Sequence, residues 1–160
     1  MSKLKPNIFV VEDDNFYNSV ISNYLKTKGY SVYSFLTGEE CLAKKDIIPD
    51  IVYLDYMLPG MDGIEVLCQL KPVYPKAEFI LLSGQTDVKV VLEAMHEGAY
   101  DYIVKDSNAK ENALNKIDQI LRYRKIIREK ELYRKTIYLV VSILVLTWLV
   151  LFIIYQINKS

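Results

Sequence analysis

Short apolar runs alternate with amphipathic segments along the first two thirds of the chain. The runs are rich in β-branched and aromatic residues, the composition of strands that are buried on both faces. We predict strands over residues 7–11, 30–35, 51–54, 79–82 and 102–104. Apolar residues between these runs recur every three or four positions, which predicts helices over 15–28, 37–45, 62–70 and 87–97 and a long helix that begins at 108–112.

Strands that alternate with helices of this length predict right-handed βαβ crossovers and a parallel sheet with both faces covered. Five such units in about 120 residues are typical of an α/β, flavodoxin-like fold with a doubly wound five-stranded parallel sheet. We therefore predict one domain of this fold over residues 1–122, then a helical segment at 123–135 and a tail at 136–158.

Single residues predict where several helices begin and end. Thr37 is a candidate N-cap, with Glu40 three positions later as its capping-box partner, and Asp62 is the N-cap of the next helix. Pro72 is expected to close the region of that helix, and Gly98 to end the fourth one.

Apolar residues at helical spacing also indicate which predicted helices are amphipathic. The first helix carries such a set: Phe16, Val20, Ile21, Tyr24 and Leu25. In the fourth helix, Val88 and Leu92 share one face with Val91 and Met95.

The charge of the chain is balanced overall but unevenly distributed. Residues 1–105 hold 10 basic and 15 acidic residues, residues 106–135 hold 9 basic and 5 acidic ones, and residues 136–160 contain only Lys159. An acidic domain is thus joined to a basic segment and then to a nearly uncharged tail. The acidic domain argues against nucleic-acid binding through the globular part.

The tail has the length and composition of a membrane span. Residues 136–158 contain no charge, and residues 137–157 are dominated by Ile, Leu and Val. As a helix, that stretch would be about 31 Å long, close to the ~30 Å hydrocarbon core of a bilayer. Tyr138 and Tyr155 near its two ends resemble interfacial anchors. We predict a single carboxy-terminal transmembrane helix; the alternative, a buried core or oligomerisation helix, would need apolar partners all round.

Basic residues before the tail predict its orientation. Seven precede it from residue 122 onwards, at 122, 124, 125, 128, 130, 134 and 135, and one lysine follows it. The positive-inside rule then keeps the domain in the cytoplasm, in agreement with an amino terminus that carries no secretory signal. Residues 123–135 also carry a weak heptad pattern, so a homodimer formed along this helix is a hypothesis.

The cysteines and the single histidine suggest no chemistry of their own. Cys41 and Cys68 form no CxxC pattern and are expected to be reduced thiols in the core or half-buried. His96 lies late in the fourth predicted helix and is expected on the surface, not as a phosphocarrier.

Polar residues follow four of the predicted strands. In a parallel sheet of this kind, ligands bind outside the carboxyl ends of the strands. Found there are Glu12, Asp13 and Asp14 after the first strand, Asp55 after the third, Ser83 after the fourth and Lys105 after the fifth. Crowded carboxylates need a cation to stay ionised, and oxygen ligands suit Mg²⁺, whereas the chain has no His or Cys cluster for zinc.

A metal held by part of this cluster would leave Asp55 as a nucleophile toward phosphorus. The metal and Lys105 would neutralise charge on a transferred phosphoryl group, and the Ser83 hydroxyl would donate a hydrogen bond to one of its oxygens. Gly60 and Gly63 shape the loop after Asp55, so that its backbone can approach the site.

Four motifs together carry a resemblance to a known family. They are VVEDD at 10–14, D55-x-x-x-P59-x-x-D62-G63, LLSG at 81–84 and Y102-x-x-K105. In this order and spacing they resemble the receiver domain of two-component response regulators, over residues 7 to about 122. This family consists of phosphoacceptors and not of enzymes in the usual sense, although self-dephosphorylation is compatible with it.

The resemblance implies a role for each matching residue. Asp55 would be phosphorylated by a histidine kinase or a phosphotransfer protein, and Lys105 would bind the phosphoryl group. Mg²⁺ would be held by Asp13, by Asp55, by the Met57 backbone carbonyl and, through water, by Glu12. Ser83 and Tyr102 would be the switch pair. Asp14 falls one place beyond the usual acidic pair and is expected to be a spectator or a helix cap.

Asp106 departs from the family pattern, because receivers usually have proline after this lysine, often with a cis peptide. A cis bond before a non-proline residue costs about 2.5–4 kcal/mol.

We consider three classes of function. The first is a membrane-anchored receiver whose output is contact with an unknown downstream protein, since the sequence shows no motif of a DNA-binding or enzymatic output module. The second is a phosphorylation-independent membrane scaffold with a receiver fold. The third, a haloacid-dehalogenase-like phosphatase, needs a second Asp two positions after the first, where this chain has Met57.

Overall fold

The computed structural model describes residues 5–84 and 88–159. It contains the following elements: β1 (Asn7–Val11), α1 (Asn15–Thr27), β2 (Ser31–Phe35), α2 (Gly38–Ala43), β3 (Ile51–Asp55), α3 (Gly63–Val73), β4 (Glu78–Ser83), α4 (Val88–His96), β5 (Asp101–Val104) and α5 (Ala109–Lys159). The predicted strands and helices are thus confirmed, with ends that differ by a few residues. Asp87, the predicted first residue of the fourth helix, lies outside the described residues. The chain divides into two units, up to Ile117 and from Asp118 onwards.

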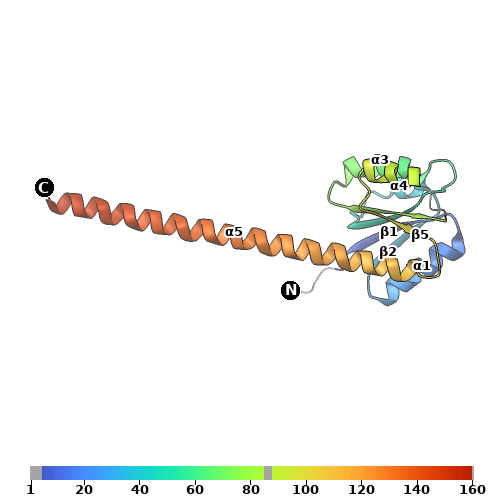
Figure 1. Cartoon of the computed structure of the whole chain (residues 1–160), viewed down its shortest axis with the longest axis horizontal. Helices are drawn as coiled ribbons and strands as arrows, with labels where there is room; N and C mark the ends of the chain where they lie inside the picture. The colour runs from blue at the N-terminus through green and yellow to red at the C-terminus, as the bar shows by residue number, and fades with distance from the viewer. Residues whose placement is uncertain (1–4, 85–87, 160) are drawn as a thin grey trace. The chain divides into compact units, whose positions relative to one another are not determined.

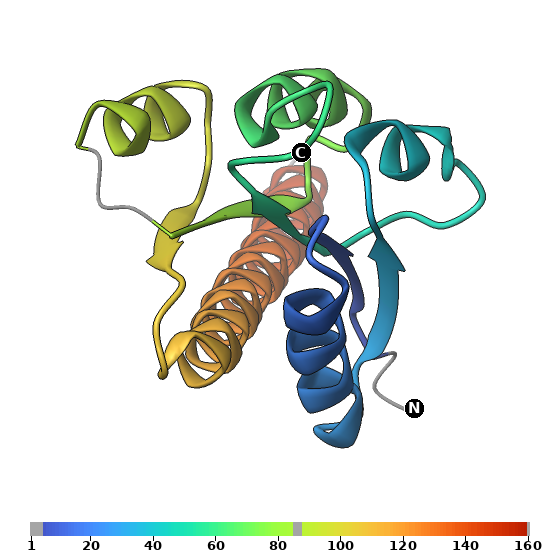
Figure 2. The same cartoon turned by 90° about the vertical axis from the view of Figure 1, so that its right-hand side faces the viewer.

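All five strands of the first unit are parallel, in the order β2-β1-β3-β4-β5. Helices α2, α3 and α4 lie on one face of this sheet, and α1 lies on the other together with the first turns of α5 (Figures 1 and 2). This arrangement confirms the doubly wound, flavodoxin-like fold. The order of the strands places β1, β3, β4 and β5 side by side, so their carboxyl ends share one edge.

The central strands are apolar on both sides because both sides are covered. Along β1 and β3, Phe9 and Val52 belong to the cluster packed under α2 and α3. Their neighbour Tyr53 points to the opposite face, where its hydroxyl donates a hydrogen bond of 2.6 Å to the Ala113 carbonyl of α5. All three side chains are fully buried. Each such apolar side chain contributes roughly 1.5–3 kcal/mol through its removal from water.

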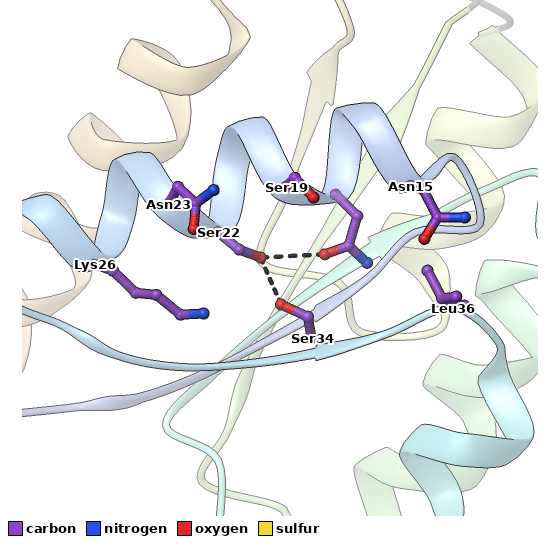
Figure 3. Close-up of a pocket in the computed structure, with 8 residues that line it drawn as sticks. Asn15, Ser19, Ser22, Asn23, Lys26, Ser34 and Leu36 are labelled. Atoms are coloured by element: carbon purple, nitrogen blue, oxygen red, sulfur yellow. Dashed lines mark hydrogen bonds between the residues drawn. The ribbon is translucent and has the colours of Figure 1, made fainter.

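Helix α1 packs on the sheet through a face that is partly polar. Of the apolar residues at helical spacing, Ile21 and Leu25 are buried, but Phe16 is 78% exposed. Asn18 and Ser22 are buried instead, and the Ser22 hydroxyl bonds both the Asn18 side chain, at 3.2 Å, and the Ser34 hydroxyl, at 2.7 Å (Figure 3). The burial of these polar groups costs little free energy because each of them has a hydrogen-bond partner.

Helix α4 likewise leaves exposed most of the apolar face that its spacing indicated. Val88 and Leu92 are exposed, as is Met95, whereas Ala94 is fully buried and Val90 packs against the core cluster. The buried face of this short helix is therefore rotated by about one residue from the apolar face that the spacing indicated. Spacing identifies an apolar face, but contact with the sheet decides which face is covered.

Helices α2 and α3 confirm two predicted N-caps and correct two other predictions about helix ends. Asp62 caps α3 by accepting hydrogen bonds from the backbone N–H groups of Ile64 and Glu65. Thr37 caps α2, but the Glu40 carboxylate accepts from the N–H of Leu36 and not from that of Thr37, so the predicted capping box is wrong. The carboxylate reaches one residue further back and satisfies a donor before the cap.

The second correction concerns Pro72, which lies inside α3 rather than after it. Proline near the carboxyl end of a helix removes only one N–H from the hydrogen-bond ladder, so the helix can continue to Val73. In the same helix, Cys68 is exposed, although we expected a core or half-buried thiol; Cys41 is buried as expected.

The second unit consists of the remainder of α5. Every described side chain from Lys125 to Asn158 is exposed. By length and composition this helix is able to cross a membrane once. The hydroxyls of Thr136, Ser142 and Thr147 donate to carbonyls three or four residues earlier, at 2.8–3.0 Å, so these polar groups are satisfied within the helix.

Candidate functional site

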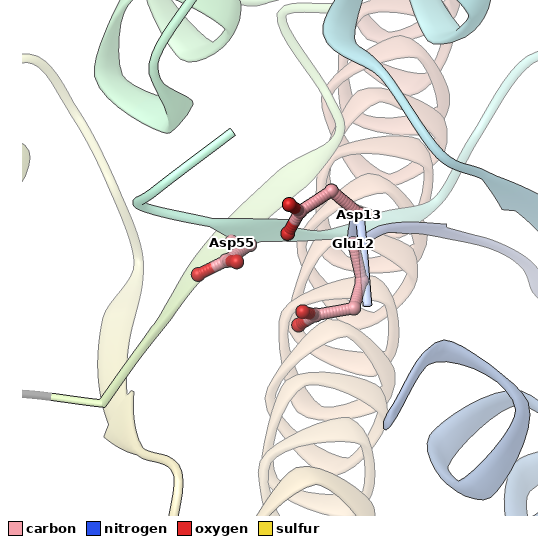
Figure 4. Close-up of side chains that lie close together, drawn as sticks. All are labelled: Glu12, Asp13 and Asp55. Atoms are coloured by element: carbon pink, nitrogen blue, oxygen red, sulfur yellow. The ribbon is translucent and has the colours of Figure 1, made fainter. Parts of the chain in front are cut away.

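The polar residues predicted at the strand ends meet at one edge of the sheet. Glu12 and Asp13 directly follow β1, and Asp55 is the last residue of β3. One carboxylate oxygen from each of these three residues lies within 4.8 Å of the other two. Figure 4 shows the side chains of Glu12 and Asp13 extending toward Asp55. The strands that carry these residues, β1 and β3, are neighbours in the sheet. The sheet therefore assembles the acidic cluster, because parallel neighbouring strands end together.

Lys105 follows β5 and reaches into this cluster. Its Nζ atom lies 2.8 Å from Asp55 Oδ2 and 2.6 Å from Glu12 Oε2, and it donates a hydrogen bond of 2.8 Å to Glu12 Oε1. The side chains of Glu12 and Asp55 are buried, and that of Lys105 is nearly so. One ammonium group thus bridges two carboxylates that would otherwise repel each other.

Glu12 is the carboxylate whose protonation is most strongly affected. Burial raises its pKa to about 7, and the charge of Asp55 acts in the same direction, while the hydrogen bond from Lys105 opposes the shift. Within the part of the chain that the structure describes, Glu12 Oε2 accepts no hydrogen bond of good geometry despite its burial. A site with three carboxylates and one amine carries excess negative charge, which favours a further cation.

The loop after β3 holds Asp55 in place through backbone contacts. The Met57 N–H donates to Asp55 Oδ1 at 3.3 Å, and the Gly63 N–H donates to the Tyr56 carbonyl at 3.0 Å. A Cβ atom at Gly63 would overlap with the backbone carbonyl of Asp55. Gly60 has a φ of +82°, a conformation that favours glycine. The predicted importance of these two glycines for the loop thus has a steric basis.

Ser83 and Tyr102 come from the two strands beyond Asp55. Ser83 is the buried last residue of β4, next to the strand that ends in Asp55. Tyr102 lies in β5, where it pairs in register with Leu81, and is half-buried. The structure brings Ser83 to the edge where the acids meet, and its role with Tyr102 as a switch pair stays a prediction.

Three further predicted positions have a defined local geometry. Asp14 accepts a hydrogen bond of 2.9 Å from the Tyr17 N–H and caps α1, which confirms its predicted role as a helix cap. No peptide bond among the described residues is cis, so the bond between Lys105 and Asp106 is trans. The Met57 side chain is exposed, and its carbonyl stays a predicted metal ligand.

Two residues near the site were not identified from the sequence. The Lys105 ammonium lies over the ring of Tyr17, 5.0 Å from its centroid, and burial raises the pKa of the Tyr17 phenol to about 12. The Asn18 side chain donates to the backbone carbonyls of Glu12 and Phe35, at 3.0 and 2.9 Å, and so fixes the segment that carries the acids. In the sequence, Asn18 could have been identified only as a polar residue among the apolar residues of its predicted helix. Nothing in the sequence distinguishes Tyr17.

Comparison with known proteins shows similarity to receiver domains along most of the chain. A model of the response regulator receiver domain matches residues 8–118. The chain is 36% identical over 104 residues to the chemotaxis protein CheY of Listeria monocytogenes, which covers 64% of this chain and 87% of that protein. It is 31% identical over 130 residues to a cyclic di-GMP phosphodiesterase of Thermotoga maritima, over 81% of this chain but only 35% of that protein. The chain therefore spans about a third of the length of this second relative.

Solved structures show the same similarity. The BeF3-activated receiver domain of DrrB superimposes with a TM-score of 0.68 at 34% identity, over 74% of this chain and 99% of that one. A CheY-like receiver domain protein from Methanospirillum hungatei JF-1 superimposes with a TM-score of 0.71 at 27% identity, over 76% of this chain and 97% of that one. The chain belongs to the receiver domain family of two-component response regulators.

Proposed function

We propose that this chain accepts a phosphoryl group on Asp55 from a histidine kinase or phosphotransfer protein, and that it does so at the cytoplasmic face of a membrane. Receiver domains in general are phosphoacceptors that interact with such donors. The observation that supports the role of Asp55 best is its position: a buried carboxylate at a strand end, 2.8 Å from the Lys105 ammonium and beside two further acids.

In the proposed reaction, an Asp55 carboxylate oxygen attacks phosphorus. The bond from phosphorus to the donor nitrogen or oxygen breaks, and an acyl phosphate forms on Asp55. The Lys105 ammonium would pair with an oxygen of the new phosphoryl group, and the Ser83 hydroxyl would donate to another. Both groups lie at the same edge of the sheet as Asp55, which supports these roles.

The acidic cluster also fits a divalent cation. Three carboxylate oxygens within 4.8 Å of each other are hard ligands, and the excess negative charge around Lys105 is what such an ion would compensate. Asp13, Asp55 and the Met57 carbonyl would hold Mg²⁺, with Glu12 acting through water. When bound, Mg²⁺ neutralises negative charge on the transferred phosphoryl oxygens.

Phosphorylation would change the charge of this edge and with it the balance of two conformations. A phosphoryl group adds roughly two negative charges. Through Ser83 and Tyr102, this charge would shift a pre-existing equilibrium of the face formed by α4, β5 and the start of α5. The output would be contact with a downstream protein that recognises one of the two states.

Membrane anchoring is the part of the proposal that depends on the tail. Residues 136–158 carry no charge, and seven basic residues precede them from residue 122 onwards. A receiver domain at 1–122, a basic juxtamembrane helix at 123–135 and a transmembrane helix at 136–158 account for this distribution. The satisfied hydroxyls of Ser142 and Thr147 suit a helix surrounded by lipid.

The phosphoacceptor is tested with the full chain and acetyl phosphate, and the product is resolved on gels that retard phosphoproteins. We expect Asp55→Asn to abolish the retarded band, and removal of Mg²⁺ by EDTA to do the same to the unsubstituted protein. Asp46→Asn is the matched control, because Asp46 is an exposed carboxylate paired with Lys44. A retarded band that survives Asp55→Asn would contradict the assignment.

A further inference from the structure

An apolar stripe of α5 that precedes the tail is exposed. Tyr123, Ile126 and Tyr133 have exposed fractions of 59, 61 and 69%. Side chains three, four and seven positions apart lie on the same face of a helix. A helix in water gains most of its stability by packing an apolar face, so an exposed stripe of this kind indicates a partner.

The stripe follows a seven-residue repeat that continues into the tail. We call the residues at its a and d positions the seam: Tyr123, Ile126, Lys130, Tyr133, Ile137, Val140 and Leu144. All seven belong to one helix, and six of them are apolar or aromatic. Apolar residues repeated at a and d are the pattern of two helices that wind around each other.

We propose that a second copy of this chain covers the seam, so that two α5 helices form a parallel coiled coil leading into the membrane. The parallel arrangement rests on the proposed membrane anchoring, because two copies with the same topology cross the bilayer in the same direction. Two identical helices in register contact each other through the same surface. This surface is then fully used in the pair, so the assembly stops at a dimer.

Charge complementarity along the seam supports this occupant. In a parallel coiled coil, a residue at position g faces position e of the next repeat on the partner. Glu129 occupies g and Arg134 occupies the following e, so each dimer would contain two pairs of opposite charge. The strongly basic positions Arg128 and Lys135 fall at f, which faces away from the partner.

Lys130 supports a pair of helices rather than a larger bundle. It is the charged residue of the seam and occupies an a position. A single lysine at a specifies register and oligomeric state at some cost in stability. Its long stem can cover apolar surface while its ammonium reaches water at the edge of a two-stranded coil.

The shape of α5 disfavours the competing occupant, a lipid surface. Residues 118–159 form one continuous helix without proline or glycine, the residues at which helices usually kink. If the tail crosses the bilayer, the segment before it continues outward along the same axis. It would then not lie flat on headgroups, and its apolar stripe would be left to another helix.

The test compares seam and outward positions by cysteine cross-linking of the full chain in native membranes. Cys68→Ser removes the exposed thiol, and single cysteines are placed at Ile126→Cys and Tyr133→Cys in the seam. Arg128→Cys and Lys135→Cys, two residues further along, are the matched outward controls. After oxidation with copper phenanthroline, we expect roughly tenfold more disulfide-linked dimer from the seam positions, because a disulfide needs closely apposed Cβ atoms.

Several results would overturn the proposal: equal cross-linking at seam and outward positions, absence of cross-linking at all four, or cross-linking of Ile126→Cys to a different protein only. A charge swap gives a second, independent readout. Glu129→Arg should lower the seam cross-linking severalfold, and adding Arg134→Glu should restore it. Glu131→Arg, the same change at an outward b position, should leave it unchanged.

Failure of the coiled coil and failure of membrane anchoring are distinguishable in the same samples. Alkaline carbonate extraction of the unsubstituted chain reports anchoring alone. A chain that stays in the membrane but lacks the seam pattern contradicts only the dimer. A chain found in the soluble fraction contradicts anchoring. In that fraction, preferential cross-linking at the seam positions still supports the dimer, and its absence contradicts the dimer as well.

Discussion

The two units of this chain treat apolar and charged residues in opposite ways. In the first unit, Leu54 is fully buried by its own chain, and the charged Asp55 next to it is buried as well. In the second unit, Leu144 is exposed and the charged residues lie outside the apolar stretch. Where the chain buries its own residues, a charge is held in place by a partner from the same chain, whereas the partners of the tail must come from elsewhere.

The energetic consequence is that equal substitutions should have unequal effects. A buried charge is tolerated only where an opposite charge and hydrogen bonds compensate for the loss of water, as Lys105 does for Asp55. An exposed leucine contributes to stability only if lipid or a second helix covers it. Three substitutions test this contrast, in order of decreasing expected effect.

The largest effect is expected for a core leucine. Leu54→Ala should lower the free energy of unfolding of the receiver unit by about 2–5 kcal/mol, because it leaves a cavity beside fully packed neighbours. Leu144→Ala, the same change in the tail, should leave that free energy unchanged. Urea denaturation in detergent, followed by circular dichroism, measures both; similar losses for the two variants would contradict the distinction.

A charge in the tail should impair anchoring without affecting the receiver unit. Val145→Asp places a carboxylate near the middle of the apolar stretch, at a cost of about 2.5–3.5 kcal/mol for membrane insertion. The variant should shift from the carbonate-resistant to the soluble fraction and still react with acetyl phosphate. Val145→Ala serves as the control, and full membrane retention of Val145→Asp would argue against a span.

A methyl group next to Asp55 should have a smaller, local effect. Gly63→Ala sets a Cβ against the Asp55 carbonyl and should cost about 1–3 kcal/mol of stability through overpacking. Gly84→Ala is a matched control, since a Cβ there meets no atom of the described residues within 4 Å. The melting temperatures of the two variants, measured together with their rates of phosphorylation, test this prediction. Equal melting temperatures would contradict it and show that the loop accommodates the methyl group without strain.

Most of the fold was predictable because its signals are local. The apolar runs of the strands and the N-caps Thr37 and Asp62 depend on neighbouring residues only. Helical spacing was less informative about which faces are buried. Phe16 shares the apolar spacing of α1 and is exposed, whereas Asn18 is buried and donates hydrogen bonds to the backbone carbonyls of Glu12 and Phe35. These carbonyls lie at the ends of two strands, so the spacing within the helix gives no information about them.

The residues at the strand ends, and a tail long and apolar enough to span a bilayer, were predictable from the sequence, because composition and period are properties of short segments. How the acids are held depends on tertiary contacts. Lys105 bridges Glu12 and Asp55, Tyr17 lies beside its ammonium, and Gly63 abuts the Asp55 carbonyl. Lys105 and Glu12 are 93 residues apart, and their distance is set by the sheet that joins β1 to β5 through β3 and β4.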